Sequence, residues 1–182
     1  DTVAVDSANN PNIISKRIRP GVVKVWDLRA EMTRAKFEET EGAELEMLLI
    51  RPIYSKVFDL EEEDSLIIPQ LTEGQKALYF FRKMDEAISE GGVESLMKTE
   101  LPEKLPLAVE AFNHIDNEKL GQMAEKVAMQ HKSLTSISAS DNGNKNYLDK
   151  FDAEYASSQD AFYKKLENYI REHPEEFIKF TD

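Results

Sequence analysis

The sequence predicts an all-α protein, a single multi-helix domain with a poorly ordered N-terminal arm. Three observations favour this fold class. Apolar residues recur every three or four positions over most of the chain, as in helices that bury one face. Few segments alternate with the period of two that half-buried strands show. The chain has 182 residues, 41% of them hydrophobic, which suffices for one domain with a substantial core.

The N-terminal region is polar and is interrupted by Pro11 and Pro20. We interpret residues 1–20 as an arm, with residues up to about 14 mobile or docked as a loose strand, and residues 21–182 as the helical domain. The segment Gly21 to Thr40 then predicts a helix with strong helix formers in its second half, although its valine-rich start also suits a strand.

The next predicted helix lies in "AELEMLLIRPIYSKVF". Because Pro52 has no backbone N–H to donate, we expect this helix to break or kink near Arg51. An acidic run from Asp59 to Asp64 and a short apolar segment ended by Pro69 follow it.

The clearest start signal of a helix is at Thr72. Gln75 follows three positions later, and the two residues together form the sequence signature of a capping box. Apolar residues then recur at helical spacing, so the sequence predicts a helix from Glu73 to about Ser89. Its apolar face is expected to belong to the core.

The only adjacent glycine pair is Gly91-Gly92, and it allows two interpretations. A phosphate-binding loop needs a preceding strand and further glycine or Lys-Ser/Thr residues, which this segment lacks. Glycine directly after a helix commonly adopts a positive φ and ends that helix. We therefore expect the pair to end one helix and lead into the next.

Downstream, the pattern predicts a short helix limited by Pro102, a helix in "PEKLPLAVEAFNHI", and a helix with Asn117 as its N-cap. The polar stretch "TSISASDNGNKN" is expected to form the longest loop. The C-terminal region predicts two helices separated by a cap at Ser157 and Ser158, with a stop at Pro174.

These helical segments carry a family resemblance. "LTEGQKALYFFRKMDEAISEGGVESLM", "LPLAVEAFNHIDNEKLGQMAEKVA" and "HPEEF" resemble a bacterial all-α domain family of uncharacterised role that includes acidic DNA-mimic proteins. The resemblance covers about residues 45–177. Its family signature is a helix ending in Asn-Gly-Gly before an aromatic residue, and here Glu90 and Val93 stand in place of the asparagine and the aromatic. The resemblance implies an all-α fold, dimerisation and, in some members, binding of DNA-binding proteins.

Several kinds of chemistry have no motif in this sequence. The absence of cysteine excludes disulfides and thiolate metal sites, and His114, His131 and His173 lack metal-ligand spacing. No serine lies in a G-x-S-x-G motif. "DNGNKNYLD" resembles a calcium loop but lacks several of its ligands, so an Asx-rich turn is the better interpretation. We predict no cofactor, no metal and no enzymatic activity.

The charge distribution indicates a different class of partner. With 35 acidic and 23 basic residues the net charge is −12, which argues against direct nucleic-acid binding and favours attraction to basic proteins. Two acidic runs stand out, and three interpretations apply to them: a solvated face, a partner-binding surface that imitates a phosphate array, or carboxylates for metal binding or catalysis. The candidate partner-binding residues are Glu38, Glu39, Glu41, Glu44, Glu46, Asp59, Glu61, Glu62, Glu63 and Asp64.

The sequence thus predicts an acidic protein-binding or regulatory module, a DNA mimic that binds a basic DNA-binding regulator. Two alternatives stay open: an enzyme with an unrecognised site, and an exported structural protein without an electrostatic partner. No apolar run reaches the roughly 20 residues of a membrane span. We expect a cytoplasmic protein, with export left open because the chain begins at Asp1.

Overall fold

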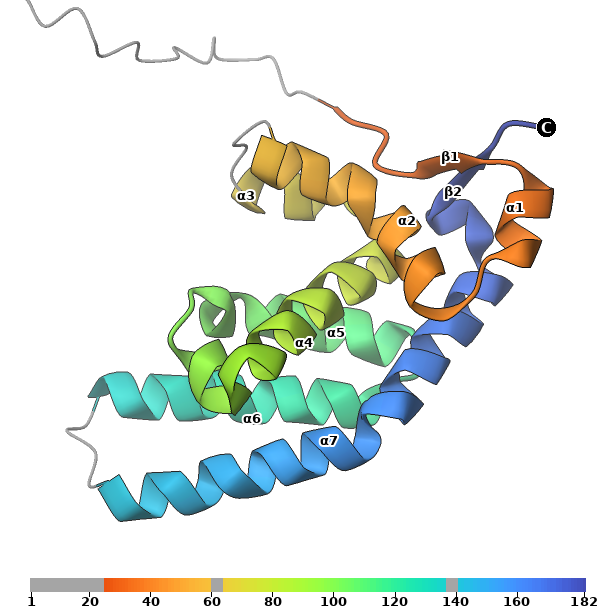
Figure 1. Cartoon of the computed structure of the whole chain (residues 1–182). Coiled ribbons are helices and arrows are strands. Elements are labelled where there is room, and N and C mark those ends of the chain that lie inside the picture. The colour runs from red at the N-terminus through yellow and green to blue at the C-terminus, as the bar shows by residue number, and fades with distance from the viewer. Residues whose placement is uncertain (1–24, 60–63, 137–140) are drawn as a thin grey trace, which may run out of the picture.

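The structure, a computed structural model, describes residues 25–59, 64–136 and 141–182 (Figure 1). The described part consists mainly of helices, with one pair of short strands, which confirms the all-α prediction. Residues 1–20, the predicted arm, lie outside the described residues. The elements in chain order are β1 (Ala30–Met32), α1 (Arg34–Glu39), α2 (Gly42–Tyr54), a π-helical turn (Ser55–Asp59), α3 (Asp64–Ile67), a 3-10 turn (Ile68–Gln70), α4 (Glu73–Met97), α5 (Leu101–His114), α6 (Glu118–Ser136), α7 (Asp141–Glu172), a 3-10 turn (Pro174–Glu176) and β2 (Ile178–Phe180).

Helix α4 lies at the centre of the described part. It contacts α2, α5, α6 and α7, and its side chains Leu78, Phe81 and Met84 are fully buried between them. Figure 1 shows α5 and α6 stacked beside α4, with α7 running along α6 and then rising to the strands. Burial of these apolar faces is the main stabilising contribution to the fold.

The predicted capping box at the start of α4 is confirmed. The Thr72 hydroxyl accepts a hydrogen bond from the Gln75 amide, and the Gln75 side-chain oxygen accepts one from the Thr72 amide, both at 3.1 Å. The Gln75 side-chain nitrogen also donates to the carbonyl of Leu28, at 3.0 Å. The residue that caps α4 therefore also attaches the chain entering β1.

The glycine pair ends a helix, as predicted. Gly92 has φ 72° and ψ −172°, in a region that is essentially restricted to glycine. The regular α-helical part of α4 therefore stops before the pair, and a second helical turn begins at Val93. The Val93 amide donates to the Asp152 carboxylate of α7 at 2.7 Å. A side chain at Gly92 would collide with that carboxylate.

The predicted helix from Gly21 to Thr40 is wrong over most of its described length. Residues 25–33 are not helical and include β1, and only Arg34–Glu39 is helical. Strand β1 pairs in parallel with β2, which lies almost 150 positions later in the sequence. The buried residues Leu28, Ala30 and Met32 alternate with a period of two, but the partner strand is too distant for local periodicity to reveal it.

Helix α2 continues through Pro52 to Tyr54, so the predicted break near Arg51 is wrong, whereas the alternative, a kink there, stays a prediction. The proline lies in the last turn of α2 and is followed by the π-helical turn, in which the hydrogen-bonding pattern widens. The missing N–H is thus tolerated close to the helix end, where the helix changes its hydrogen-bonding pattern in any case.

The C-terminal region contains one long helix rather than a loop and two helices. The stretch predicted as an Asx-rich turn lies in α7, and α6 extends to Ser136, so the long loop prediction is wrong. Ser157 and Ser158 lie inside α7 and do not cap a helix. Ser157 donates back to the Glu154 carbonyl at 2.9 Å, and Ser158 accepts from Lys119 of α6 at 2.6 Å. The predicted stop at Pro174 is confirmed.

Asn117 precedes α6, but its side chain does not act as the predicted N-cap. Its Nδ2 donates to the Phe162 carbonyl at 3.4 Å, and its Oδ1 has no hydrogen-bond partner within the described part of the chain. The asparagine is buried and is oriented toward α7 instead of toward the first amides of α6.

Substitution of the glycines tests the contact between α4 and α7. We expect Gly92→Ala to lower the free energy of unfolding by more than about 1 kcal/mol, because it adds a collision with Asp152 to the strain of a positive φ. Gly42→Ala is the matched control, since Gly42 has φ 54° but open space around it. Urea denaturation measures the free energy of unfolding of both variants. An equal decrease for Gly92→Ala and Gly42→Ala would contradict a role of the Asp152 contact.

Candidate partner-binding surface

Four of the predicted partner-binding carboxylates lie together on one exposed segment. Glu38 and Glu39 end α1, Glu41 precedes α2, and Glu44 lies in the first turn of α2. All four side chains are exposed. We call residues 38–44 the acidic turn.

The local sequence explains why the chain reverses here. Thr33 begins α1, with its hydroxyl accepting a hydrogen bond from the Lys36 amide at 3.2 Å. Thr40 ends α1 and is buried, with its hydroxyl donating to the Lys36 carbonyl at 2.7 Å. Gly42, the first residue of α2, then adopts φ 54°, so that α2 begins two residues after Thr40 without steric strain.

Arg171 near the end of α7 holds the acidic turn in place. Its guanidinium donates to the Phe37 carbonyl at 2.6 Å and to the Thr40 carbonyl, and it lies 4.7 Å from the centre of the Phe37 ring. A cation at the last carbonyls of a helix is favourable because those carbonyls have no partner within the helix. Glu167, one turn earlier in α7, accepts a hydrogen bond from the Gly42 amide at 3.4 Å.

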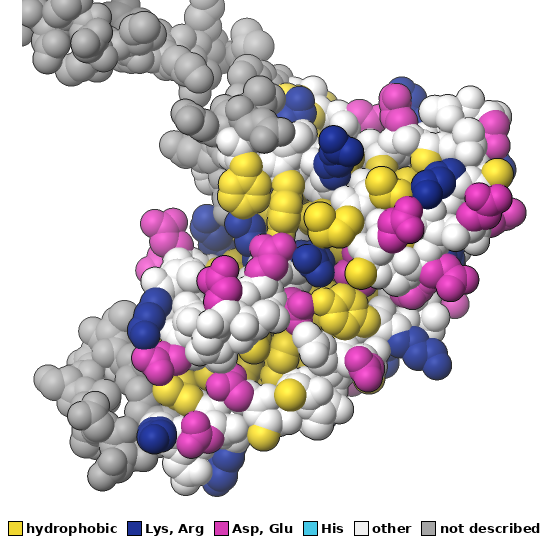
Figure 2. All heavy atoms as spheres, viewed as in Figure 1, with side chains coloured by type: hydrophobic (Ala, Val, Ile, Leu, Met, Phe, Trp, Pro, Cys, Tyr) yellow, Lys and Arg dark blue, Asp and Glu magenta, His cyan; other side chains and the backbone are white. Residues whose placement is uncertain are grey.

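The charges of the acidic turn are only partly neutralised. Glu44 forms an ion pair with Lys36 at 3.0 Å, whereas Glu38, Glu39 and Glu41 form no ion pair within the described part of the chain. Figure 2 shows acidic side chains gathered along the edge formed by α1, with basic side chains between them. This edge therefore offers several unpaired carboxylates to solvent.

Glu46 does not belong to this surface, which corrects the sequence prediction. It is 1% exposed and faces α4, where its Oε2 lies 3.9 Å from Arg82 Nη1. Burial raises the pKa of the Glu46 carboxyl to about 7, against the lowering effect of Arg82. Helical periodicity explains the difference, because Glu46 shares the inward face of α2 with Leu45 and Leu49.

The second predicted run is not placed by the structure. Glu61, Glu62 and Glu63 lie outside the described residues, and the side chains of Asp59 and Asp64 are not described either. Whether the two runs share one face stays a prediction.

A buried polar cluster joins α4 to α7 beside Glu46. The Asp85 carboxylate accepts hydrogen bonds from the Tyr155 hydroxyl at 2.9 Å, from Gln159 at 2.6 Å and from the Tyr163 hydroxyl at 2.6 Å. Burial, reinforced by the Asp85 charge, raises the pKa of both tyrosine hydroxyls, which therefore remain donors. No local sequence pattern indicates this cluster, because Asp85 lies 70 to 78 positions before its three partners on α7.

A groove between α5 and α6 is a further acidic feature that the sequence analysis missed. A cavity of about 370 Å³ is lined by Val109 and Asn113 of α5 and by Glu118, Gln122 and Glu125 of α6. Gly121 allows the two helices to approach, since a side chain there would meet Asn113. The spacing of Glu118, Gln122 and Glu125 at i, i+4 and i+7 was the available signal.

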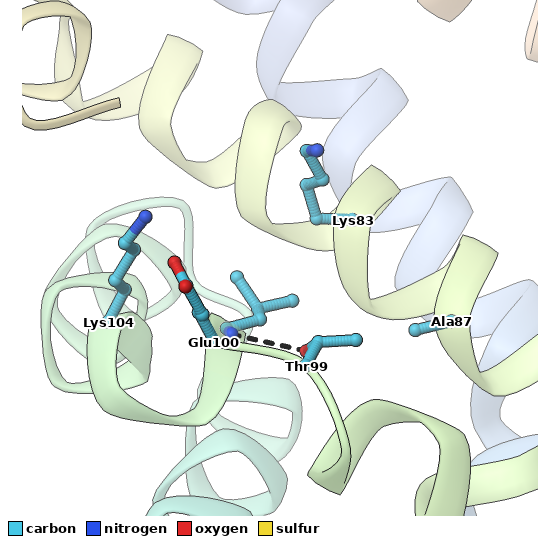
Figure 3. Close-up of a pocket in the computed structure, with 6 residues that line it drawn as sticks. Lys83, Ala87, Thr99, Glu100 and Lys104 are labelled. Carbon is cyan, nitrogen blue, oxygen red and sulfur yellow. Dashed lines mark hydrogen bonds between the residues drawn. The ribbon is translucent and has the colours of Figure 1, made fainter. Parts of the chain in front are cut away.

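Figure 3 shows a pocket at the turn between α4 and α5. It measures about 290 Å³ and includes Lys83 of α4, Lys104 of α5, Thr99 and Glu100. The two lysines extend from different helices and do not converge on one point. The Thr99 hydroxyl accepts from the Leu101 amide at 3.1 Å and donates to the Leu96 carbonyl at 2.8 Å, so its hydrogen bonds serve the start of α5. The pocket is explained by this helix junction.

The described residues contain neither a cluster of metal ligands nor a membrane-spanning helix. Among residues 25–59, 64–136 and 141–182, no group of three or more His, Asp or Glu side chains has the geometry to hold a metal ion. Over the same ranges, no helix has both the length and the apolar composition needed to cross a bilayer.

The fold and the surface define an all-α protein with an exposed, anchored acidic turn. A family model described as DMP19-like protein matches residues 69–173, which is more than half of the chain. The chain therefore belongs to the DMP19-like protein family. No curated protein and no solved structure matches it. The matched region includes α4 to α7 but not the acidic turn, which precedes it.

The buried Glu46 predicts a specific dependence of stability on pH. Its pKa rises from an ordinary 4.5 to about 7 in the folded state, so the folded state binds more protons between these values. The free energy of unfolding should then fall as pH rises through this window. We expect Glu46→Gln, which cannot ionise, to be more stable than the wild type by about 3 kcal/mol above pH ~7.5, with a small difference below pH ~4.5.

Urea denaturation across this pH range measures the effect. Glu44→Gln is the matched control, because Glu44 is an exposed carboxylate in the same helix and should leave the pH profile nearly unchanged. A constant stability difference between Glu46→Gln and the wild type at all pH values would show that the buried carboxyl is not responsible.

Proposed function

We propose that this chain is an acidic protein-binding module that presents carboxylates, in the manner of DNA phosphates, to a basic DNA-binding protein. The observation that carries the proposal is the set of exposed, unpaired carboxylates of Glu38, Glu39 and Glu41 on a turn anchored by Arg171. Membership of the DMP19-like family, in which DNA mimicry occurs, supports it. Asp59, Glu61, Glu62, Glu63 and Asp64 belong to the same proposal on the basis of the sequence.

The position of these carboxylates favours a binding role over a structural one. Glu41 and Glu44 are near the N-terminus of α2, where negative charge stabilises a helix. Glu38 and Glu39, in contrast, end α1, where the helix dipole disfavours negative charge. Local helix stability therefore does not account for them, whereas attraction to a basic partner does.

The anchoring of the turn also supports the proposal. A partner that binds a pre-ordered array of charges loses less conformational entropy than one that must order it. Arg171 and Glu167 hold the backbone on both sides of Glu41, through Thr40 and Gly42. Spacing along a helical turn places such carboxylates several ångströms apart, comparable to successive phosphates on one strand.

The partner is a protein with a basic nucleic-acid-binding surface, and the module itself is not expected to bind DNA, since its net charge is −12. The family resemblance also implies a homodimer, and this stays a prediction. An intracellular role in regulation of DNA binding follows from the proposal.

Charge reversal tests the proposal. Proteins captured on the immobilised chain at about 50 mM salt and released at about 500 mM salt are identified, and their DNA binding is measured by fluorescence anisotropy. We expect the wild-type chain to displace DNA from such a partner. The variant Glu38→Lys, Glu39→Lys, Glu41→Lys should compete about tenfold or more weakly, because each contact becomes repulsive. Reversal of Glu61, Glu62 and Glu63 tests the second run in the same way.

The matched control reverses Glu90, Glu103 and Glu110, which are exposed on α4 and α5 and change the net charge equally. Both triple variants should retain the wild-type melting temperature within a few degrees, since exposed charges contribute little to stability. The proposal fails if both variants compete as well as the wild type, or if the released proteins do not bind DNA.

A further inference from the structure

Strand β1 has one hydrogen-bonding edge that faces away from β2. The Ala30 amide donates to the Phe177 carbonyl at 2.8 Å, and the Met32 carbonyl accepts from the Thr181 amide at 3.2 Å. In a parallel ladder alternate residues point to the same neighbour, so the N–H and C=O of Glu31 point to the opposite side. Neither group forms a hydrogen bond within the described part of the chain.

This edge lies beside a groove between β1 and α2. The cavity measures about 430 Å³. It is lined by the three residues of β1 and by Lys36 of α1. The opposite side consists of Leu48, Arg51 and Pro52 of α2 and Ser55 of the π-helical turn, which recur at helical spacing. A strand edge next to a helix is the geometry by which several peptide-binding domains accept an extended segment as an additional strand.

The charge in the groove indicates the chemistry of the occupant. The Arg51 side chain is exposed and forms no ion pair or hydrogen bond within the described residues, although the molecule carries twelve more acidic than basic residues. Lys36 also lines the groove, and its ammonium group forms an ion pair with Glu44. An unpaired guanidinium beside the apolar surfaces of Leu48 and Pro52 is complementary to a segment that carries both carboxylate and apolar side chains.

We propose that the groove between β1 and α2 binds an extended segment of a partner protein in which apolar residues alternate with acidic ones. The segment adds to the free edge of β1 through the N–H and C=O of Glu31. Its side chains alternate in direction, so that apolar residues on the face toward α2 contact Leu48 and Pro52. The exposed guanidinium of Arg51 extends past the edge of the segment and pairs with a carboxylate on the opposite face. This surface is distinct from the acidic turn and has the opposite electrostatic preference.

A labelled peptide tests the proposal directly. The probe is a fluorescein-labelled hexapeptide of alternating valine and glutamate, and the control peptide has lysine in place of glutamate. We expect saturable binding of the glutamate peptide to the intact chain by fluorescence anisotropy, and binding of the lysine peptide that is about tenfold weaker or more. The amide resonance of Glu31 should shift on binding.

Two substitutions locate the binding. Glu31→Pro removes the outward N–H without removing a hydrogen bond to β2, and should weaken binding about tenfold, whereas Glu31→Gln keeps the N–H and should retain it. Arg51→Glu reverses the unpaired charge and should weaken binding of the glutamate peptide by a similar factor. Lys150→Glu, an exposed reversal on α7, controls for the change in net charge. Thermal unfolding confirms that each variant is folded, and Arg51→Glu provides the test if Glu31→Pro does not fold.

Three results would overturn the proposal. The first is no binding of the glutamate peptide up to about 1 mM, and the second is equal binding of the lysine peptide. The third is binding that Glu31→Pro and Arg51→Glu leave unchanged. If sedimentation instead shows a dimer that Glu31→Pro dissociates, a second copy of the chain covers this edge and the partner segment is excluded.

Discussion

The contact of Arg171 with the end of α1 determines where the acidic turn lies. One guanidinium satisfies the carbonyls of Phe37 and Thr40, which the short helix α1 leaves without partners, and it stacks on the Phe37 ring. Because α1 has only six residues, its own hydrogen bonds cannot hold it in a helical conformation. Its shape and its orientation therefore depend on a side chain that is supplied by α7, more than 130 positions later.

Helix α7 makes comparable polar contacts along the rest of its length. Tyr155, Gln159 and Tyr163 converge on the carboxylate of Asp85, and Asp152 accepts the amide of Val93 after the glycine pair. Directly after the glycine pair, the backbone N–H of Val93 donates to an anion, as the amides of a phosphate-binding loop do. Here the anion is the Asp152 carboxylate of the same protein. The polar face of α7 thus connects the described N-terminal part of the chain to the helices that match the family model.

The sequence predicted the features of the fold that depend on neighbouring residues. The capping box of Thr72 and Gln75 and the end of a helix at Gly92 are both determined within a few positions, and both are confirmed. Strand β1 was missed because it is stabilised by β2 at the far end of the chain, and tertiary pairing overrides local propensity. The polar start of α7 was interpreted as a loop because its residues favour turns.

The candidate surface was predictable only in part, for the same reason. Composition indicated the acidic run, but the burial of Glu46 follows from the direction in which α2 faces α4. The anchoring by Arg171 and the unpaired charge of Arg51 both depend on contacts, or their absence, between segments distant in sequence. The net charge therefore does not indicate that the molecule has two surfaces of opposite charge, the acidic turn and the groove beside β1.

Hydrogen exchange at the Thr40 amide tests most directly whether α7 holds the acidic turn in place. We expect this amide to be protected in the wild type and to exchange about tenfold or more faster in Arg171→Met, because the end of α1 then loses its partner. The control is Lys165→Met, since Lys165 of α7 donates to the Asp116 carbonyl in another turn, and it should leave Thr40 unchanged. Equal exchange at Thr40 in the wild type and in Arg171→Met would contradict the account.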